Sequence, residues 1–143
     1  MKPIGYWLNR TDEALTGAMN AALADFGLTR LAWQVLNVVD DTHEAADTDV
    51  LSVLSANADV PALTSAIDTL LTDGWLRRPA PGRLDLTDGS RRRLTDAARR
   101  VDAFRELSTA GISPDEYRTT VSVLERMTRN VEAEQAGRPN RAS

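Results

Sequence analysis

The sequence contains no cysteine and only one histidine among its 143 residues. Without cysteine, a disulfide framework, a thiolate nucleophile and a cysteine redox sensor are all excluded. The single histidine, His43, stands in the acidic run Asp-Asp-Thr-His-Glu. A histidine with carboxylates can bind a metal, but a solvated acidic loop is the simpler interpretation. We therefore predict no metal site and no cofactor.

Catalytic motifs are missing as well. One histidine does not supply a credible Ser-His-Asp set, and no glycine-rich loop of the kind that cradles phosphates is present. The adjacent carboxylates Asp115 and Glu116 follow a Ser-Pro pair, which is a helix start rather than an acid–base pair. The sequence thus argues against an enzyme and predicts no catalytic residue.

Long apolar runs are also absent. No stretch reaches the 18 or so apolar residues that a membrane-spanning helix needs, and the N-terminus lacks the pattern of a signal peptide. The apolar content of 42% is nevertheless sufficient for a folded core. We predict a cytoplasmic protein with a single domain over residues 1–134 and a disordered polar tail over 135–143.

Positive charge is missing from one long part of the chain. The formal net charge is −4, and no lysine or arginine occurs between Leu31 and Leu76, where eight acidic residues lie. From Arg77 to Arg105 the balance reverses, with nine arginines against four aspartates. The basic footprint that could contact nucleic acid is therefore the wing and the helix after it.

The stretch from residue 47 to 87 carries the main structural pattern. Val50, Leu51 and Leu54 have helical spacing, and a second apolar helical face follows between Asp59-Val60-Pro61 and Gly74. Two short runs then flank the turn Pro79-Ala80-Pro81-Gly82, as in a β-hairpin. Helix, turn, helix and hairpin together predict a winged helix-turn-helix over about 29–87. Such a module places its second helix in the major groove of DNA.

Further helices are predicted on both sides of this module. Apolar residues recur at helical spacing over about 6–25 and over about 87–133, with a break at Gly111 and a capping-box sequence from Ser113 to Glu116. A helix from Thr29 precedes the loop at 40–46, and Thr87 is the expected cap of the next long helix. The fold class is therefore mainly α with a small β-hairpin wing. The terminal apolar stripes lack a further layer to cover them, so we predict a homodimer formed by these helices.

Four motifs in this order resemble a known family. They are Gly27-Leu28-Thr29 with Trp33, Val35 and Leu36; Ile67 and Leu70 with Gly74-Trp75-Leu76; Leu86-Thr87 with Gly89; and Ser113-Pro114-Asp115-Glu116. Over roughly Tyr6 to Val131 the chain resembles the MarR family of bacterial transcription regulators. The resemblance implies an obligate dimer, one winged module per lobe and often a small phenolic or aromatic ligand between the dimerisation helices and the module.

Candidate site residues follow from the module and from the resemblance. Hydroxyls on the second helix and arginines of the wing and the helix after it are the candidate contacts to double-stranded operator DNA: Thr64, Ser65, Thr69, Arg77, Arg78, Arg83, Arg91 and Arg92. If the family's ligand pocket is retained, Trp7, Met19 and Trp33 are the candidates to line it. Aromatic residues at helical spacing are more often part of the core, which is the simpler interpretation of the tryptophans.

Two departures from the family leave two functions open. The family's wing usually carries an Asp-x-Arg signature on a longer hairpin, and its recognition helix usually carries arginine or lysine. Here the hairpin is short, and residues 62–73 contain no cation. The first interpretation is a dimeric DNA-binding regulator, a repressor relieved by a ligand. The second is a MarR-like interaction protein whose operator binding is weakened or lost.

Overall fold

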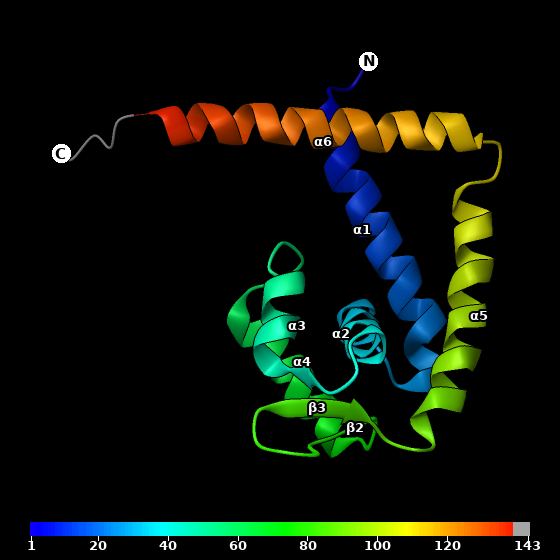
Figure 1. The fold of residues 1–143 in the computed structure, drawn as a ribbon. Coiled ribbons are helices and arrows are strands. Elements are labelled where there is room, and N and C mark those ends of the chain that lie inside the picture. Colours follow the sequence, from blue (N-terminus) through cyan, green and yellow to red (C-terminus); the bar gives the residue numbers. More distant parts are fainter. Residues whose placement is uncertain (139–143) are drawn as a thin grey trace. The chain divides into compact units, whose positions relative to one another are not determined.

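A computed structural model describes residues 1–138 of the chain (Figure 1). It divides into two compact units, one from Met1 to Arg105 and one that begins at Glu106. The described residues form six α-helices, one short 3₁₀ helix and a small antiparallel sheet of three strands. The fold class predicted from the sequence is therefore confirmed. None of the helices within residues 1–138 has the length and apolarity to cross a lipid bilayer.

The first unit opens with helix α1 (Ile4–Leu23), which continues into the 3₁₀ helix η1 (Ala24–Phe26). The helix thus starts two residues before the predicted 6–25 segment, and its last predicted residues form the 3₁₀ turn. Gly27, at φ 68°, ends the turn in a left-handed conformation that favours glycine. Thr29 then caps helix α2 (Arg30–Asp41), because its side-chain oxygen accepts a hydrogen bond from the Ala32 N–H at 3.1 Å.

Helix α2 forms the centre of the core of this unit. It buries Trp33, Val35, Leu36 and Val39, while α4 and the strands bring further apolar side chains to it. In Figure 1, α2 lies between α1 and the α3–α4 pair. Each fully buried leucine or valine here stabilises the fold by about 1.5–3 kcal/mol relative to an exposed one. The helix-turn-helix therefore packs against this core through the buried faces of its helices.

The helix-turn-helix is formed by α3 (Asp47–Val53) and α4 (Val60–Thr72). Asp59 caps α4 by accepting the Ala62 N–H at 2.9 Å, and Pro61 lies in its first turn, as the sequence predicts. Leu63, Ile67 and Leu70 are buried. Gly74 follows the helix at φ 81°, which turns the chain into the first strand of the hairpin.

The sheet has the order β1-β3-β2. Strands β2 (Leu76–Arg77) and β3 (Arg83–Leu86) form the predicted hairpin, in which Arg77 is opposite Asp85. Strand β1 (Ala45–Ala46) pairs with the other edge of β3, where Ala46 is opposite Arg83. The sequence interpretation placed residues 40–46 in a loop and missed this strand, because two alanines carry no strand pattern. The pairing brings the start of α3 directly beside the wing.

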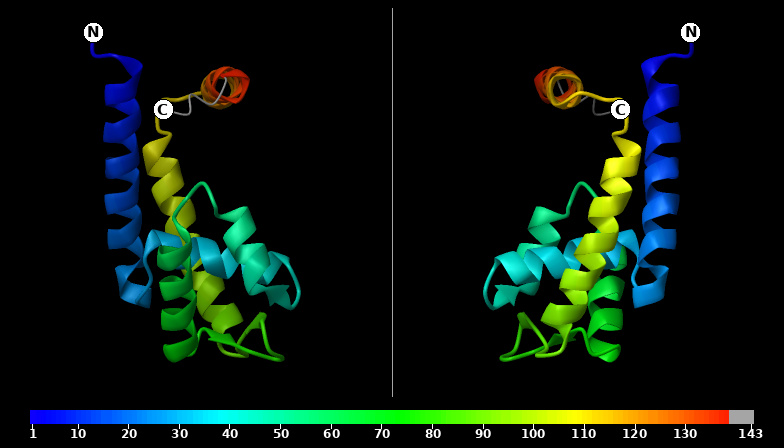
Figure 2. Two further views of the ribbon diagram at one scale, coloured as in Figure 1. Left: turned by 90° about the vertical axis from the view of Figure 1, so that its left-hand side faces the viewer. Right: turned by 90° about the vertical axis from the view of Figure 1, so that its right-hand side faces the viewer.

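Helix α5 (Ser90–Ser108) starts three residues later than expected. The predicted cap, Thr87, is wrong: its hydroxyl donates to the Gly74 carbonyl at 2.7 Å, and it also contacts the Ser90 hydroxyl. Thr87 thus connects the end of the wing to the end of α4. Farther along, Arg100 of α5 pairs with Asp25 of η1 at 2.9 Å, which attaches α5 to the turn that follows α1 (Figure 2 shows the helices).

The second unit is dominated by α6 (Pro114–Gly137). Its predicted capping box is present, since Ser113 Oγ accepts the Glu116 N–H at 3.1 Å and Glu116 accepts the Ser113 N–H at 3.0 Å. The helix continues to Gly137, so the prediction of a tail disordered from residue 135 is wrong for 135–137. Glu, Ala and Gln are good helix formers, and Glu134 pairs with Arg138 at 3.7 Å. The rest of the predicted tail, 139–143, lies outside the described residues.

A candidate DNA interface

Helix α4 presents a polar face that suits a groove of DNA. Thr64, Ser65 and Thr69 are all exposed, opposite the buried Leu63, Ile67 and Leu70. Hydroxyls can donate to and accept from both phosphates and base edges. The only charged side chain among the residues of this helix is Asp68, which repels phosphate. The helix thus offers hydrogen bonds but no cation.

The wing is short, and its turn lies against the start of α3. Arg78, at the beginning of the turn, makes two hydrogen bonds to Asp47: Nη1 to Oδ1 at 2.8 Å and Nη2 to Oδ2 at 3.0 Å. The hydrogen bonds with Asp47 raise the pKa of Arg78 above its already high value. The backbone N–H of Asp47 also donates to the carbonyl of Gly82 at 3.2 Å. The wing turn is therefore attached to the helix-turn-helix by side-chain and backbone contacts.

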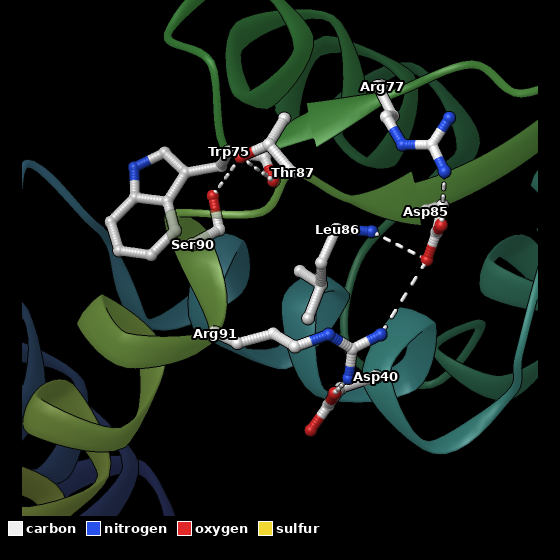
Figure 3. A network of polar contacts seen from close by, with 8 residues as sticks. All are labelled: Asp40, Trp75, Arg77, Asp85, Leu86, Thr87, Ser90 and Arg91. Carbon is white, nitrogen blue, oxygen red and sulfur yellow. Dashed lines mark hydrogen bonds and ion pairs between the residues drawn. The ribbon is translucent and has the colours of Figure 1, made fainter.

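A second polar network lies behind the hairpin (Figure 3). Asp85 accepts a hydrogen bond from Arg77 at 2.9 Å and another from the Leu86 N–H at 3.0 Å, and its side chain is only 12% exposed. Arg91, at the start of α5, lies between two carboxylates, 4.0 Å from Asp85 and 3.3 Å from Asp40 of α2. Arg77 and Arg91 thus help to hold the strands, α2 and α5 together.

Arg83 and Arg92 differ from Arg77, Arg78 and Arg91, which are paired with carboxylates. Both are exposed, and within residues 1–138 neither has a carboxylate at ion-pair distance. Arg93, which follows Arg92, makes a cation–π contact, since its guanidinium lies 4.1 Å from the centre of the Trp75 ring. Of the five arginines predicted to contact DNA, three are therefore paired with acids and two retain an uncompensated charge.

The predicted ligand-binding residues are not brought together. Trp33 lines a pocket of about 260 Å³ between α2 and α5, together with Asn37, Asp40, Arg91, Leu94, Thr95 and Ala98. Met19 is buried in the core of the same unit, and Trp7 is 54% exposed with its ring against Tyr6. Neither Met19 nor Trp7 lines that pocket. The pocket has an aromatic wall from Trp33 and a cationic group from Arg91.

Sequence reasoning missed the acidic partners of the arginines. It treated Asp40, Asp47 and Asp85 as part of a general negative charge rather than as specific contacts. The available signal was the alternation of an acid-only segment with an arginine-rich one, which predicts attraction between the two. The spacing of the residues could not identify the pairs, since 31 residues separate Asp47 from Arg78.

Comparison with known proteins gives different results for sequence and structure. A scan against protein-family models finds no match. A search of curated proteins also finds no match. The fold, in contrast, matches many solved structures. A transcriptional regulator of the MarR family from Rhodococcus sp. RHA1 is 25% identical, with a TM-score of 0.74 over 87% of this chain and 91% of that one. The chain has the MarR-family fold.

Two other MarR-type structures extend this result. The transcriptional repressor CouR, bound to p-coumaroyl-CoA, is 24% identical, with a TM-score of 0.78 over 89% of this chain and 92% of that one. A mutant of MarR from E. coli complexed with operator DNA is 23% identical, with a TM-score of 0.77 over 87% of this chain and 93% of that one. The resemblance to the MarR family predicted from the sequence is therefore confirmed at the level of the fold.

Proposed function

We propose that this protein is a dimeric transcription regulator that binds operator DNA through its winged helix-turn-helix. The main support is the fold of the first unit together with its likeness to MarR in complex with operator DNA. The exposed hydroxyls of α4 are the candidate base contacts, and they stand on a helix that the core holds rigidly. Apolar side chains exposed on α1 and on α6, such as Trp7, Tyr117 and Val121, support the dimer.

The electrostatic part of binding is assigned to Arg83 and Arg92. Non-specific affinity for DNA comes from cations that neutralise phosphates and release counterions. An arginine that is already paired with a carboxylate adds little to this term, because the pair carries no net charge. Arg83 on β3 and Arg92 on α5 are exposed and unpaired within residues 1–138. They are therefore the best candidates for phosphate contacts.

The finer proposal is that a small anionic aromatic ligand relieves repression. The pocket between α2 and α5 supports it, because Trp33 can stack on an aromatic ring and Arg91 can pair with a carboxylate. CouR, which has a similar fold, was solved with p-coumaroyl-CoA bound. Arg91 also contacts Asp40 and Asp85, so a ligand carboxylate would compete with these contacts behind the wing. Binding at the pocket would thereby affect the position of the wing.

A second candidate function is an interaction protein of the same fold that no longer binds an operator. The specific observation in its favour is the charge of the helix-turn-helix: α3 and α4 carry aspartates and no cation, and Asp47, Asp40 and Asp85 neutralise three nearby arginines. DNA phosphates are repelled by such a surface. The two candidates therefore differ in one measurable property, which is affinity for DNA.

The deciding experiment measures binding to a fluorescent duplex that contains the promoter of the protein's own gene. Fluorescence anisotropy is recorded over a salt series from low to physiological ionic strength, with a scrambled duplex of the same length as the control. Binding that is tighter to the promoter and weakens linearly in log–log form supports the regulator. If the promoter duplex is not bound even at low salt, the interaction protein is the better assignment.

A further inference from the structure

The wing is attached to α3 through Arg78, an arginine at the beginning of the wing turn. Arg78 lies between strand β2 and the turn, and Asp47 is the first residue of α3. The two side chains meet through both guanidinium nitrogens, at 2.8 and 3.0 Å. Arg78 Nη1 also lies 3.4 Å from the carbonyl of Arg83 on the opposite strand. Its guanidinium is thus occupied from two sides.

This geometry has a direct electrostatic consequence. A bidentate arginine–carboxylate pair presents the same fork of N–H groups that a phosphate would use. While Asp47 occupies the fork, the pair has no net charge and displaces no counterion from DNA. The carboxylate of Asp68 on α4 adds to the negative potential at Arg78, which is consistent with the raised pKa of this arginine. A phosphate must therefore compete with acids of the protein itself.

We propose that Asp47 withholds Arg78 from DNA and thereby lowers the affinity of the winged helix-turn-helix for the phosphate backbone. The inference rests on the proposed function, DNA binding, and adds a residue that sets its strength. Asp47 belongs to the helix-turn-helix itself, so the module contains its own competitor for the wing cation. The Arg78–Asp47 pair is distinct from the pocket between α2 and α5, which neither residue lines.

The pair at Arg78 is better suited to this role than the pair at Arg77. The partner of Arg77, Asp85, is nearly buried and also accepts the Leu86 N–H, so its removal would disturb the strand. Asp47 and Arg78 are exposed to 34% and 36%, respectively. An Asp47→Asn substitution therefore leaves no buried charge unpaired and keeps a polar group at the start of α3. The Asp47 backbone N–H that binds the Gly82 carbonyl is unaffected.

The test compares the native protein with D47N, R78A and the double variant D47N/R78A, using full-length chains. The probes are a duplex containing the promoter of the protein's own gene and a scrambled duplex of the same length. D59N is the matched control: it also removes one aspartate charge from the helix-turn-helix, but Asp59 pairs with no arginine within residues 1–138, and asparagine caps a helix as well as aspartate. D47S serves as a second variant, and thermal unfolding verifies that each protein is folded.

D47N and D47S should steepen the slope of log affinity against log salt by about 0.9 per protomer. If the affinities are equal at 1 M salt, this slope corresponds to about eightfold tighter binding per protomer at 0.1 M salt. The gain should be the same for both duplexes, because the phosphate term is independent of sequence. R78A should leave the slope of the native protein unchanged but cancel the gain in the double variant. D59N should change the affinity less than D47N does, and it should not steepen the slope of log affinity against log salt.

Each outcome decides the matter. If the native protein binds DNA and neither D47N nor D47S steepens the slope, the inference is overturned while the proposed function stands. If D47N binds DNA whereas the native protein and D47N/R78A do not, Asp47 is confirmed as the competitor for Arg78. If neither protein binds either duplex at low salt, the inference and the proposed function both fail. A gain that persists in D47N/R78A also overturns the inference, since Arg78 would not be its source.

Discussion

The unpaired arginines make a quantitative prediction about DNA binding. Replacing Arg83 or Arg92 by alanine should reduce the slope of log affinity against log salt by about 0.9 per protomer, because each is assigned one phosphate. At 0.1 M salt this loss amounts to about an eightfold weaker binding, or roughly 1.2 kcal/mol per protomer. Both side chains are exposed and carry no ion pair within residues 1–138, so neither substitution should affect folding.

The assay is fluorescence anisotropy with the promoter duplex and a scrambled duplex, each over a salt series. R83A and R92A should weaken binding to both duplexes by similar factors. Thr64→Ala is the matched control on α4, since it removes a hydroxyl and no charge. It should leave the slope unchanged and reduce the preference for the promoter instead. If R83A and R92A retain both affinity and slope while the native protein binds tightly, the assignment of the phosphate contacts is wrong.

Other predictions test the fold, the pocket and the assembly. Asp59→Ala should lower the free energy of unfolding by about 1 kcal/mol in urea denaturation, whereas D59N should change it little, because only alanine cannot accept the Ala62 N–H. The hydrogen bonds from Ser113 lower the pKa of the Glu116 carboxyl below its ordinary value of 4.5, so the capping box should be complete above pH 4.5 and lost as the pH falls through the folded-state pKa. An NMR titration that places the pKa of Glu116 at or above 4.5 would contradict the assignment. Salicylate should change the tryptophan fluorescence of the native protein saturably. The change should disappear in Trp33→Phe and persist in Trp7→Phe. A flat titration to millimolar ligand would remove the pocket from the proposal. Light scattering should give the mass of a dimer at micromolar concentration, and a stable monomer would refute the proposed assembly.

Much of the fold could be predicted because its local signals are strong. The Thr29 cap, the Asp59-Val60-Pro61 start of α4 and the capping box at Ser113 act within four residues of chain. The helical spacing of Leu63, Ile67 and Leu70 likewise depends only on the period of the helix. Each of these elements is where the sequence places it, to within a few residues.

The parts that the sequence did not predict depend on contacts between distant segments. Strand β1 exists because Ala45 and Ala46 meet β3, and two alanines have no strand preference of their own. Thr87 bonds to Gly74 rather than to the next helix because the wing returns to the end of α4. The same limit applies to the candidate site. The exposed hydroxyls of α4 followed from helical spacing, but the pairing of Arg78 with Asp47 followed only from the folded chain.

The pairing of the arginines in and next to the wing has a consequence for how such a module would select its site. Cations bind every DNA sequence alike, so compensating Arg77, Arg78 and Arg91 within the protein lowers affinity for random DNA and for the operator by the same factor. The ratio between the two affinities then rests on the hydroxyls of α4. Because the genome presents a great excess of random sites, weaker phosphate binding reduces the time spent on them and costs nothing in discrimination. A winged helix-turn-helix with a net negative charge is therefore compatible with specific binding, provided that Arg83 and Arg92 supply enough phosphate contact to hold the module on the duplex.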